Sequence, residues 1–381
     1  MSDMQDVIEK ARELLGENNA KEALSVLKPL KKKLKNPNDS ILPLMQIFID
    51  VYLEKGDVEK AYPILSDACE LDPTGSKGGS EKFFTFGQVT GGEDGIKIIY
   101  QGIENISQEA GESISEEQLN KIVGGLLSMI EIWMTDLCME PNAESQCEEL
   151  IQKAMEISEN RSPETWSMLG SIRISQQRFS DASNAFIQAW EYFEIKKQNI
   201  EKSLASNAIA SHREYIELLQ PLLALAKMCI EMGLYEIALK IISAVKDIEE
   251  DNLENYYLEG FVHYLLCKVT QFKATKKDIE ITAENIYEFN EHFEDIRIEI
   301  NNPTLSDLIN DSRIALTFVV KLGENVDKED NVSQELVAGA NKLLKELGGA
   351  VDINTLMRSK KGENVEEADL ELDLEVEEDE N

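Results

Sequence analysis

Residues 162–194 read SPETWSMLGSIRISQQRFSDASNAFIQAWEYFE, and this stretch decides the fold class. The small residues Gly170 and Ala182 would let two antiparallel helices approach closely, while Trp166 and Phe186 would fill the space around that contact. The apolar residues recur at helical spacing on both sides of the polar sequence SQQRFSD. The stretch therefore predicts a pair of antiparallel helices.

The spacings W-x2-L-G and A-x3-F in this stretch are those of the tetratricopeptide repeat (TPR). Further copies with the same arrangement of small and apolar residues lie at 7–34, 41–73, 118–159 and 222–250. The small residues that begin the second helices are Ala23, Ala61, Cys147, Ala182 and Ala238. Their uneven gaps indicate that some helices are lengthened and that other segments are inserted.

The segments between the copies also have a helical character. Residues 82–106 resemble a shortened pair, residues 191–220 an extended helix with a connection, and residues 278–300 another long helix. Two more helices are expected at 305–322 and 333–347. We therefore predict an all-α TPR superhelix over residues 1–349 with long inserted helices; the alternative is an irregular helical bundle.

Residues 350–381 have a different composition. Residues 363–381 contain 11 acidic side chains in 19 and no Lys or Arg, alternating with Leu370, Leu372, Leu374 and Val376. Such a segment repels itself and cannot bury a core, so we expect a disordered acidic tail. Removing its charge from the total of −35 leaves −24, so the predicted superhelix is itself acidic.

The charge balance narrows the possible partners. Lys and Arg total 38 and Asp and Glu total 73 in 381 residues. Phosphate backbones and anionic membrane surfaces require a basic face, so direct binding of nucleic acid or membrane is not expected. A strongly basic partner is favoured, because opposite fields speed encounter and hold the complex.

Catalytic and metal-binding patterns are missing from the sequence. The five cysteines form no CxxC pair, and His212, His263 and His292 have no partner at metal-ligand spacing. The glycine-rich stretches 75–80 and 90–95 lack phosphate-loop spacing and are interpreted as turns between helices. No signal peptide or membrane span is apparent, which favours a reduced compartment such as the cytosol or nucleus. We expect neither an enzyme nor a cofactor.

Carboxylates recur where the first helix of each pair would face a concave groove. Phasing from the small residues places Asp50 and Glu54 there in one copy, Asp136 and Glu140 in a second, and Glu231 in a third. Equivalent carboxylates in separate repeats would form an acidic strip for a basic ligand. The alternative is that they are ordinary solvated residues, since the chain is rich in acids.

Two further features bear on binding. Tyr257 and Phe261 share one face of an expected helix and are candidate apolar anchors, half in the core and half in the groove. KPLKKKLK at 28–35 has the composition of a nuclear import signal, which would bring in an import receptor. We favour instead the basic end of an amphipathic helix.

The sequence resembles a fungal family, the TPR assembly chaperones dedicated to the fourth large-subunit ribosomal protein. The resemblance rests on the following stretches: AYPILSDACELDP, KFFTFGQVTGGEDGIKIIYQGIE, ETWSMLGSIRISQQRFSDASNAFIQAW, MCIEMGLYEIALKI and LELDLEVEED. It extends over nearly the whole chain, and the glycine-interrupted stretch 82–102 is its most specific part.

The resemblance implies a superhelical TPR protein that captures a newly made basic ribosomal protein and shields its long basic internal extension. It also implies escort from the cytoplasm to the nucleus for assembly of the large subunit precursor. Two other functions remain open at this point: a TPR scaffold or adaptor in another complex, and a histone-type chaperone that uses the acidic tail.

Overall fold

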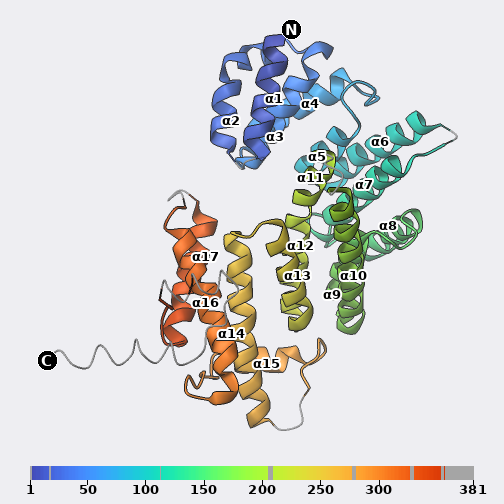
Figure 1. The fold of residues 1–381 in the computed structure, drawn as a ribbon. Coiled ribbons are helices and arrows are strands. Elements are labelled where there is room, and N and C mark those ends of the chain that lie inside the picture. The colour runs from blue at the N-terminus through green and yellow to red at the C-terminus, as the bar shows by residue number, and fades with distance from the viewer. Residues whose placement is uncertain are drawn as a thin grey trace. The chain divides into compact units, whose positions relative to one another are not determined.

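The computed structural model describes residues 2–16, 19–111, 113–204, 209–276, 280–326, 330–352 and 356. The regular structure in these residues is helical and contains no strand, which confirms the all-α prediction (Figure 1). Contacts divide the chain into two compact units, Met1–Met168 and Leu169–Asn381, and the boundary falls inside α9 (Pro163–Ser175). A single solenoid over 1–349 stays a prediction.

The first unit is a series of helical pairs, each helix packing on its neighbour in the chain. The pairs are α1 (Ser2–Gly16) with α2 (Ala20–Leu27), α3 (Leu42–Glu54) with α4 (Val58–Leu71), α5 (Glu81–Thr90) with α6 (Gly92–Ala110), and α7 (Glu116–Met134) with α8 (Ala143–Ile157). The predicted small residues Ala23, Ala61 and Cys147 are buried at the start of second helices. These pairs confirm the repeat pattern.

The basic stretch 28–35 continues α2 as a 3-10 helix, η1 (Lys28–Lys35). Leu30 and Leu34 are half-buried against the core that α1 to α4 share, and the lysines are exposed. The stretch is therefore amphipathic, as we favoured from the sequence. A second 3-10 turn, η2 (Asp39–Ile41), leads into α3.

The pair α5 and α6 brings its two backbones into direct contact. A Cβ atom on Gly87 would lie 2.6 Å from the Gly95 carbonyl oxygen, and one on Gly95 would lie 2.3 Å from the Gly87 carbonyl oxygen. The turn between the helices uses positive φ at Gly91 and Gly92, which glycine adopts at little cost. Glycines thus let a shortened pair retain TPR-like packing, as predicted for 82–106.

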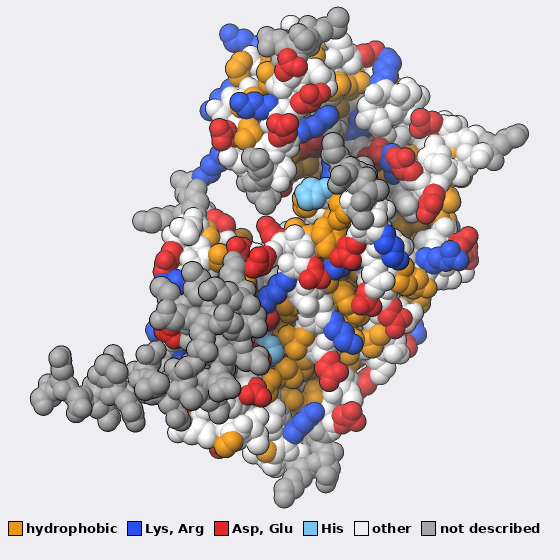
Figure 2. Space-filling model, in the orientation of Figure 1, with side chains coloured by type: hydrophobic (Ala, Val, Ile, Leu, Met, Phe, Trp, Pro, Cys, Tyr) orange, Lys and Arg blue, Asp and Glu red, His pale blue; other side chains and the backbone are white. Residues whose placement is uncertain are grey.

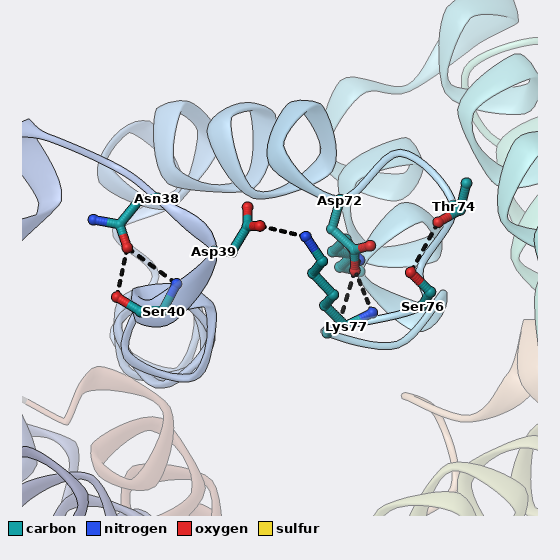
Figure 3. A network of polar contacts seen from close by, with 9 residues as sticks. Asn38, Asp39, Ser40, Asp72, Thr74, Ser76 and Lys77 are labelled. Carbon is teal, nitrogen blue, oxygen red and sulfur yellow. Dashed lines mark hydrogen bonds and ion pairs between the residues drawn. The ribbon is translucent and has the colours of Figure 1, made fainter. Parts of the chain in front are cut away.

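The loop between α4 and α5 folds around a carboxylate of the chain itself (Figure 3). Asp72 accepts hydrogen bonds from the backbone N–H groups of Lys77 (3.2 Å) and Gly78 (2.8 Å) and pairs with the Lys82 ammonium at 2.8 Å. The Lys77 side chain pairs with Asp39. Because the amides of this glycine-rich loop bind Asp72, the turn interpretation of 75–80 is confirmed.

The second unit contains the remaining helices. They are the rest of α9, α10 (Phe179–Leu204), α11 (Ile209–Glu217), α12 (Leu219–Glu231), α13 (Tyr235–Ile248), α14 (Leu253–Thr275), α15 (Ile286–His292), α16 (Ser306–Gly323) and α17 (Asn331–Glu346), with the 3-10 turn η3 (Pro303–Leu305) before α16. A Cβ atom on Gly170 would lie 2.4 Å from the Phe186 ring, the close approach that the sequence predicted.

A pair not recognised from the sequence joins α14 to α16, across the insertion that holds α15. Gly260 lies against Leu316, where a Cβ atom would be 2.6 Å from Cγ, and its carbonyl accepts the Ser312 hydroxyl at 2.7 Å. Ser312 and Leu316 thus have the spacing of Ala182 and Phe186. The insertion hides this repeat in the sequence.

Two segments have a structure that differs from the prediction. The prediction of a long helix at 278–300 is wrong, because only the short α15 forms between residues 280 and 300. Glu284 instead accepts hydrogen bonds from the Ser180 backbone N–H (2.9 Å) and hydroxyl (2.7 Å) at the start of α10. In 191–220 the extended helix is the end of α10, and α11 follows as a separate helix. Within the disordered tail predicted at 350–381, Val351 and Leu356 are buried, and the Val351 N–H donates to the Thr317 hydroxyl at 3.1 Å. The prediction is therefore wrong for these two residues, and the acidic stretch 363–381 lies outside the described residues.

Candidate functional site

The carboxylates predicted for the first unit fall into two groups. Asp50 is half-buried in the last turn but one of α3 and accepts a hydrogen bond from the Gln46 amide at 2.7 Å. Glu54 is exposed and is the last residue of α3. The structure thus brings these two together on one helix, as expected.

Asp136 and Glu140 are not on a first helix, so their predicted equivalence to Asp50 and Glu54 is wrong. Helix α7 ends at Met134, and both residues lie in the connection to α8. Asp136 accepts a hydrogen bond from the Gly92 backbone N–H at 2.9 Å and so caps the start of α6. Glu140 is exposed in the turn that precedes α8.

The side chain that takes the place of Asp50 on α7 is Glu131. In α5, Gln88 directly follows Gly87, the residue in contact with α6, just as Asp50 directly follows Ile49 in α3. The Gln88 amide donates a hydrogen bond to the Glu131 carboxylate at 2.8 Å. Glu131 in turn follows the fully buried Ile130. Sequence reasoning missed Glu131 because it counted back from Cys147 through a connection that is longer than assumed. Counting from the buried residues of α7 would have found it.

We call Asp50, Glu54, Gln88 and Glu131 the first-helix wall of the first unit. Its members come from α3, α5 and α7, consecutive first helices of the repeat. Acidic side chains are also scattered over the face shown in Figure 2, so charge density alone does not mark the wall. What marks it is the recurrence of the same position in successive pairs.

Glu231 is the corresponding residue in the second unit. It is exposed and is the last residue of α12, as Glu54 is of α3, and each is followed two residues later by a glycine with positive φ. The residue that matches Asp50 there is Lys227, which pairs with Glu254 of α14 at 2.7 Å. The acidic position therefore recurs at the end of the helix and is replaced by a cation one turn earlier.

Tyr257 and Phe261 lie on one face of α14, as predicted, with ring centroids 6.1 Å apart. Both are half-buried against the core that α14, α16 and α17 form. Gly339 of α17 lies against Tyr257, where a Cβ atom would be 2.9 Å from the hydroxyl oxygen. Burial raises the pKa of Tyr257. Tyr257 therefore lies against α17, and both rings pack in part against the core; their contact with a ligand stays a prediction.

The described residues hold no cluster of three or more side chains suited to binding a metal ion. Among the cysteines, Cys138 is exposed and the others are buried. His263 lies on α14, and burial lowers its pKa despite the nearby carboxylate of Asp311. None of the described helices combines the length and the apolar composition that crossing a bilayer requires.

The fold and these surfaces define an all-α TPR-type repeat protein with acidic side chains on its first helices. Residues 251–371 match the family model described as the ACL4 C-terminal domain. A "Probable assembly chaperone of rpl4" from Schizosaccharomyces pombe is 26% identical over 275 residues, which cover 71% of this chain and 76% of the relative.

A protein of the same description from Emericella nidulans is 25% identical over 274 residues, covering 70% of this chain and 66% of that relative. A solved structure described as "Assembly Chaperone of RpL4 (Acl4) (Residues 1-338)" aligns with 71% of this chain and 99% of its own, at 22% identity and a TM-score of 0.48. The family and curated matches confirm the resemblance that the sequence indicated.

Proposed function

We propose that this chain is an assembly chaperone dedicated to the fourth large-subunit ribosomal protein, and that it binds and shields a basic segment of that client. The observation that carries the proposal is the similarity to two curated proteins named for this role, each over about 70% of the chain. The role is one of binding and not of catalysis.

The charge of the chain suits such a client. Ribosomal proteins that contact RNA need basic surfaces to neutralise phosphates, and an isolated basic segment attracts unintended anionic partners. A chain with net charge −35 attracts that segment and holds it by opposite charge. We infer that the first-helix wall supplies part of this contact, with Glu231 in the second unit as a further acidic position.

The positions of Glu54 and Glu231 support this inference. A negative charge in the last turn of a helix opposes the helix dipole, an effect of about 0.3–1 kcal/mol. Helix stability therefore does not explain why two first helices end in glutamate. A basic ligand would neutralise these charges on binding.

A charge-reversal experiment tests the wall. The variant Asp50→Lys, Glu54→Lys, Glu131→Lys replaces attraction by repulsion, and like charges at an interface cost several kcal/mol. We expect binding of the purified client to weaken at least about a hundredfold, equivalent to about 2.8 kcal/mol. The affinity is measured by calorimetry, and circular dichroism verifies that the variant is folded.

The matched control reverses three exposed glutamates on second helices of the same unit: Glu59, Glu70 and Glu109. It changes the net charge by the same amount and should weaken binding far less than the wall variant, since charges that do not contact the ligand act on it only through a field that salt screens. Equal weakening by both sets would show diffuse attraction and would refute the wall.

The identity of the client is tested separately. Affinity purification of the full chain should recover the ribosomal protein as the stoichiometric partner, and the chain should prevent its aggregation in isolation. A scaffold for folded proteins would not prevent aggregation. Recovery of a histone or a signalling protein as the only stoichiometric partner would contradict the proposal.

We also propose that the chain accompanies its client from the cytoplasm to the nucleus, with an import receptor as a further partner. Fluorescence imaging of the tagged chain should show it in both compartments. Changing Lys31, Lys32 and Lys33 to Gln should leave its distribution unaltered if η1 is only a structural element. Exclusion from the nucleus would instead assign the import signal to η1.

A further inference from the structure

An apolar pocket of about 270 Å³ opens on the first unit between α6, α7 and α8. Its apolar lining is Tyr100 and Ile103 from α6, Ile122, Leu126 and Met129 from α7, and Leu150 and Ile157 from α8. Cavities of about 150 Å³ already hold a benzene ring. This pocket therefore has room for one large apolar side chain.

The pocket lies on the opposite side of α7 from the first-helix wall. Successive residues of an α-helix are rotated by about 100° around its axis. On α7 the mean direction of the pocket residues Ile122, Leu126 and Met129 is therefore about 170° from the direction of Glu131. Its other walls are the second helices α6 and α8. A ligand along the first-helix wall would not fill it.

The edge of the pocket combines an exposed ring with charges. Tyr100 is 55% exposed, an unusual position for a large ring that borders an apolar cavity. Glu156 and Lys153 stand at the rim, and the Lys153 ammonium is paired with Glu149 at 2.6 Å. Glu104 follows Tyr100 by one turn on α6 and is exposed. The rim is therefore negative on balance.

We propose that this pocket is a second docking site, which binds a basic peptide segment through one large apolar side chain of that segment. The apolar lining accepts the side chain, and Glu104 and Glu156 attract flanking Lys or Arg residues. The acidic tail of the chain itself is a poor occupant, because its leucines alternate with acids that this rim would repel. The site is separate from the first-helix wall on which the proposed function relies.

Three labelled peptides test the chemistry on the full chain: KRLFKR, KRAAKR and EELFEE. The first two carry the same charge, so diffuse attraction cancels and their difference reports the apolar contact. Fluorescence anisotropy should show KRLFKR binding at least about tenfold more tightly than KRAAKR, and EELFEE not binding measurably. Equal binding of the first two peptides, or preference for EELFEE, would overturn the proposal.

Two variants locate the binding. Tyr100→Lys places a cation at the pocket rim, and Tyr287→Lys makes the same change at a tyrosine of similar exposure (57%) in the second unit. The first should abolish the preference for KRLFKR over KRAAKR, and the second should leave it intact. The first-helix wall variant should also keep the preference, so a failure of the proposed function would not imitate a failure of this site. Preference retained in Tyr100→Lys would place the peptide elsewhere and refute the pocket.

Discussion

Asp72 and Lys82 are the most completely buried ion pair in the described structure, each with 2% of its side chain exposed. Burial alone would raise the pKa of Asp72, but hydrogen bonds from Lys82 and from the Gly78 and Lys77 backbones outweigh it and hold the pKa below its ordinary value. Lys82 also donates to the Gly79 carbonyl at 2.6 Å. The pair thus organises the loop between α4 and α5.

Removing one partner of this pair should be costly. Asp72→Ala leaves the Lys82 charge buried and unpaired, which typically costs about 3–5 kcal/mol. We expect the free energy of unfolding to fall by that amount in urea denaturation. The double variant Asp72→Ala, Lys82→Met should recover part of the loss, since no unpaired charge remains. A double variant less stable than the single one would contradict this explanation.

The same pair predicts a pH dependence. A carboxyl whose pKa is lower in the folded than in the unfolded state stabilises the fold above about pH 4, and the stabilisation is lost as the pH falls further. The stability difference between the wild type and Asp72→Asn should therefore shrink on acidification below about pH 4. Urea titrations at several pH values measure it; a constant difference would show that Asp72 is not the titrating group.

The α5–α6 crossing gives a prediction at the scale of elements. Ala normally stabilises a helix relative to Gly by about 0.5–1 kcal/mol. At Gly87 the added Cβ would meet the Gly95 carbonyl and the Ile99 side chain, so Gly87→Ala should instead lower the free energy of unfolding by about 1–3 kcal/mol. Gly124→Ala on α7 has no atom within 4 Å of its Cβ and should raise it. Thermal and urea unfolding of both variants distinguish these signs.

Helix α6 also depends on the cap that Asp136 supplies. Asp136→Ala leaves the Gly92 N–H without that acceptor and should cost about 0.5–2 kcal/mol in urea unfolding. Glu140→Ala, in the same connection, should stay within about 0.5 kcal/mol of the wild type. If the two variants were equally stable, the cap would have no role in holding α6.

The sequence predicts the helical pairs well where two small residues mark the contact. The pairs Gly170 with Ala182 and Gly87 with Gly95 can be recognised in the sequence, because only small residues permit two helices to approach so closely. The conformation of segment 278–300 was not predicted, because it depends on side-chain hydrogen bonds, some to the distant helix α10 and some within the segment itself. Glu284 caps α10, and Asn285 accepts the Thr282 N–H at 2.7 Å and donates to the Glu280 carbonyl at 2.8 Å. Such side-chain bonds compete with helix formation.

The candidate site was predicted only in part, for a related reason. Asp50 and Glu54 were placed correctly on a first helix, because the turn after α3 has ordinary TPR length. Asp136 and Glu140 were misplaced because α7 ends early, where the Leu137 N–H bonds back to the Ile132 carbonyl at 3.1 Å. A turn of this kind does not change the spacing of the apolar residues enough to be recognised in the sequence. The residues after it were therefore assigned to helix positions that they do not have.

For the whole molecule, the acidic C-terminal residues give the remaining prediction. Residues 363–381 carry few hydrophobic side chains, evenly mixed with acids, which cannot offset about 1–2 kcal/mol of conformational entropy per ordered residue. Deleting them should leave the melting temperature unchanged in differential scanning calorimetry. A decrease of several degrees would show that the segment docks on the rest of the chain.

The contact between Gly87 and Gly95 also has a genetic consequence. Every missense change that one nucleotide can make in a glycine codon introduces a side chain with a Cβ atom, and neither position has room for one. A saturation library of the gene, selected for growth that depends on this protein, should be depleted of missense alleles at both codons, with alanine the least depleted because its side chain is the smallest. The codon for Gly124, on a neighbouring helix, should retain most of its alleles. The difference in allele frequency between these codons would then reveal the backbone contact from genetic data alone.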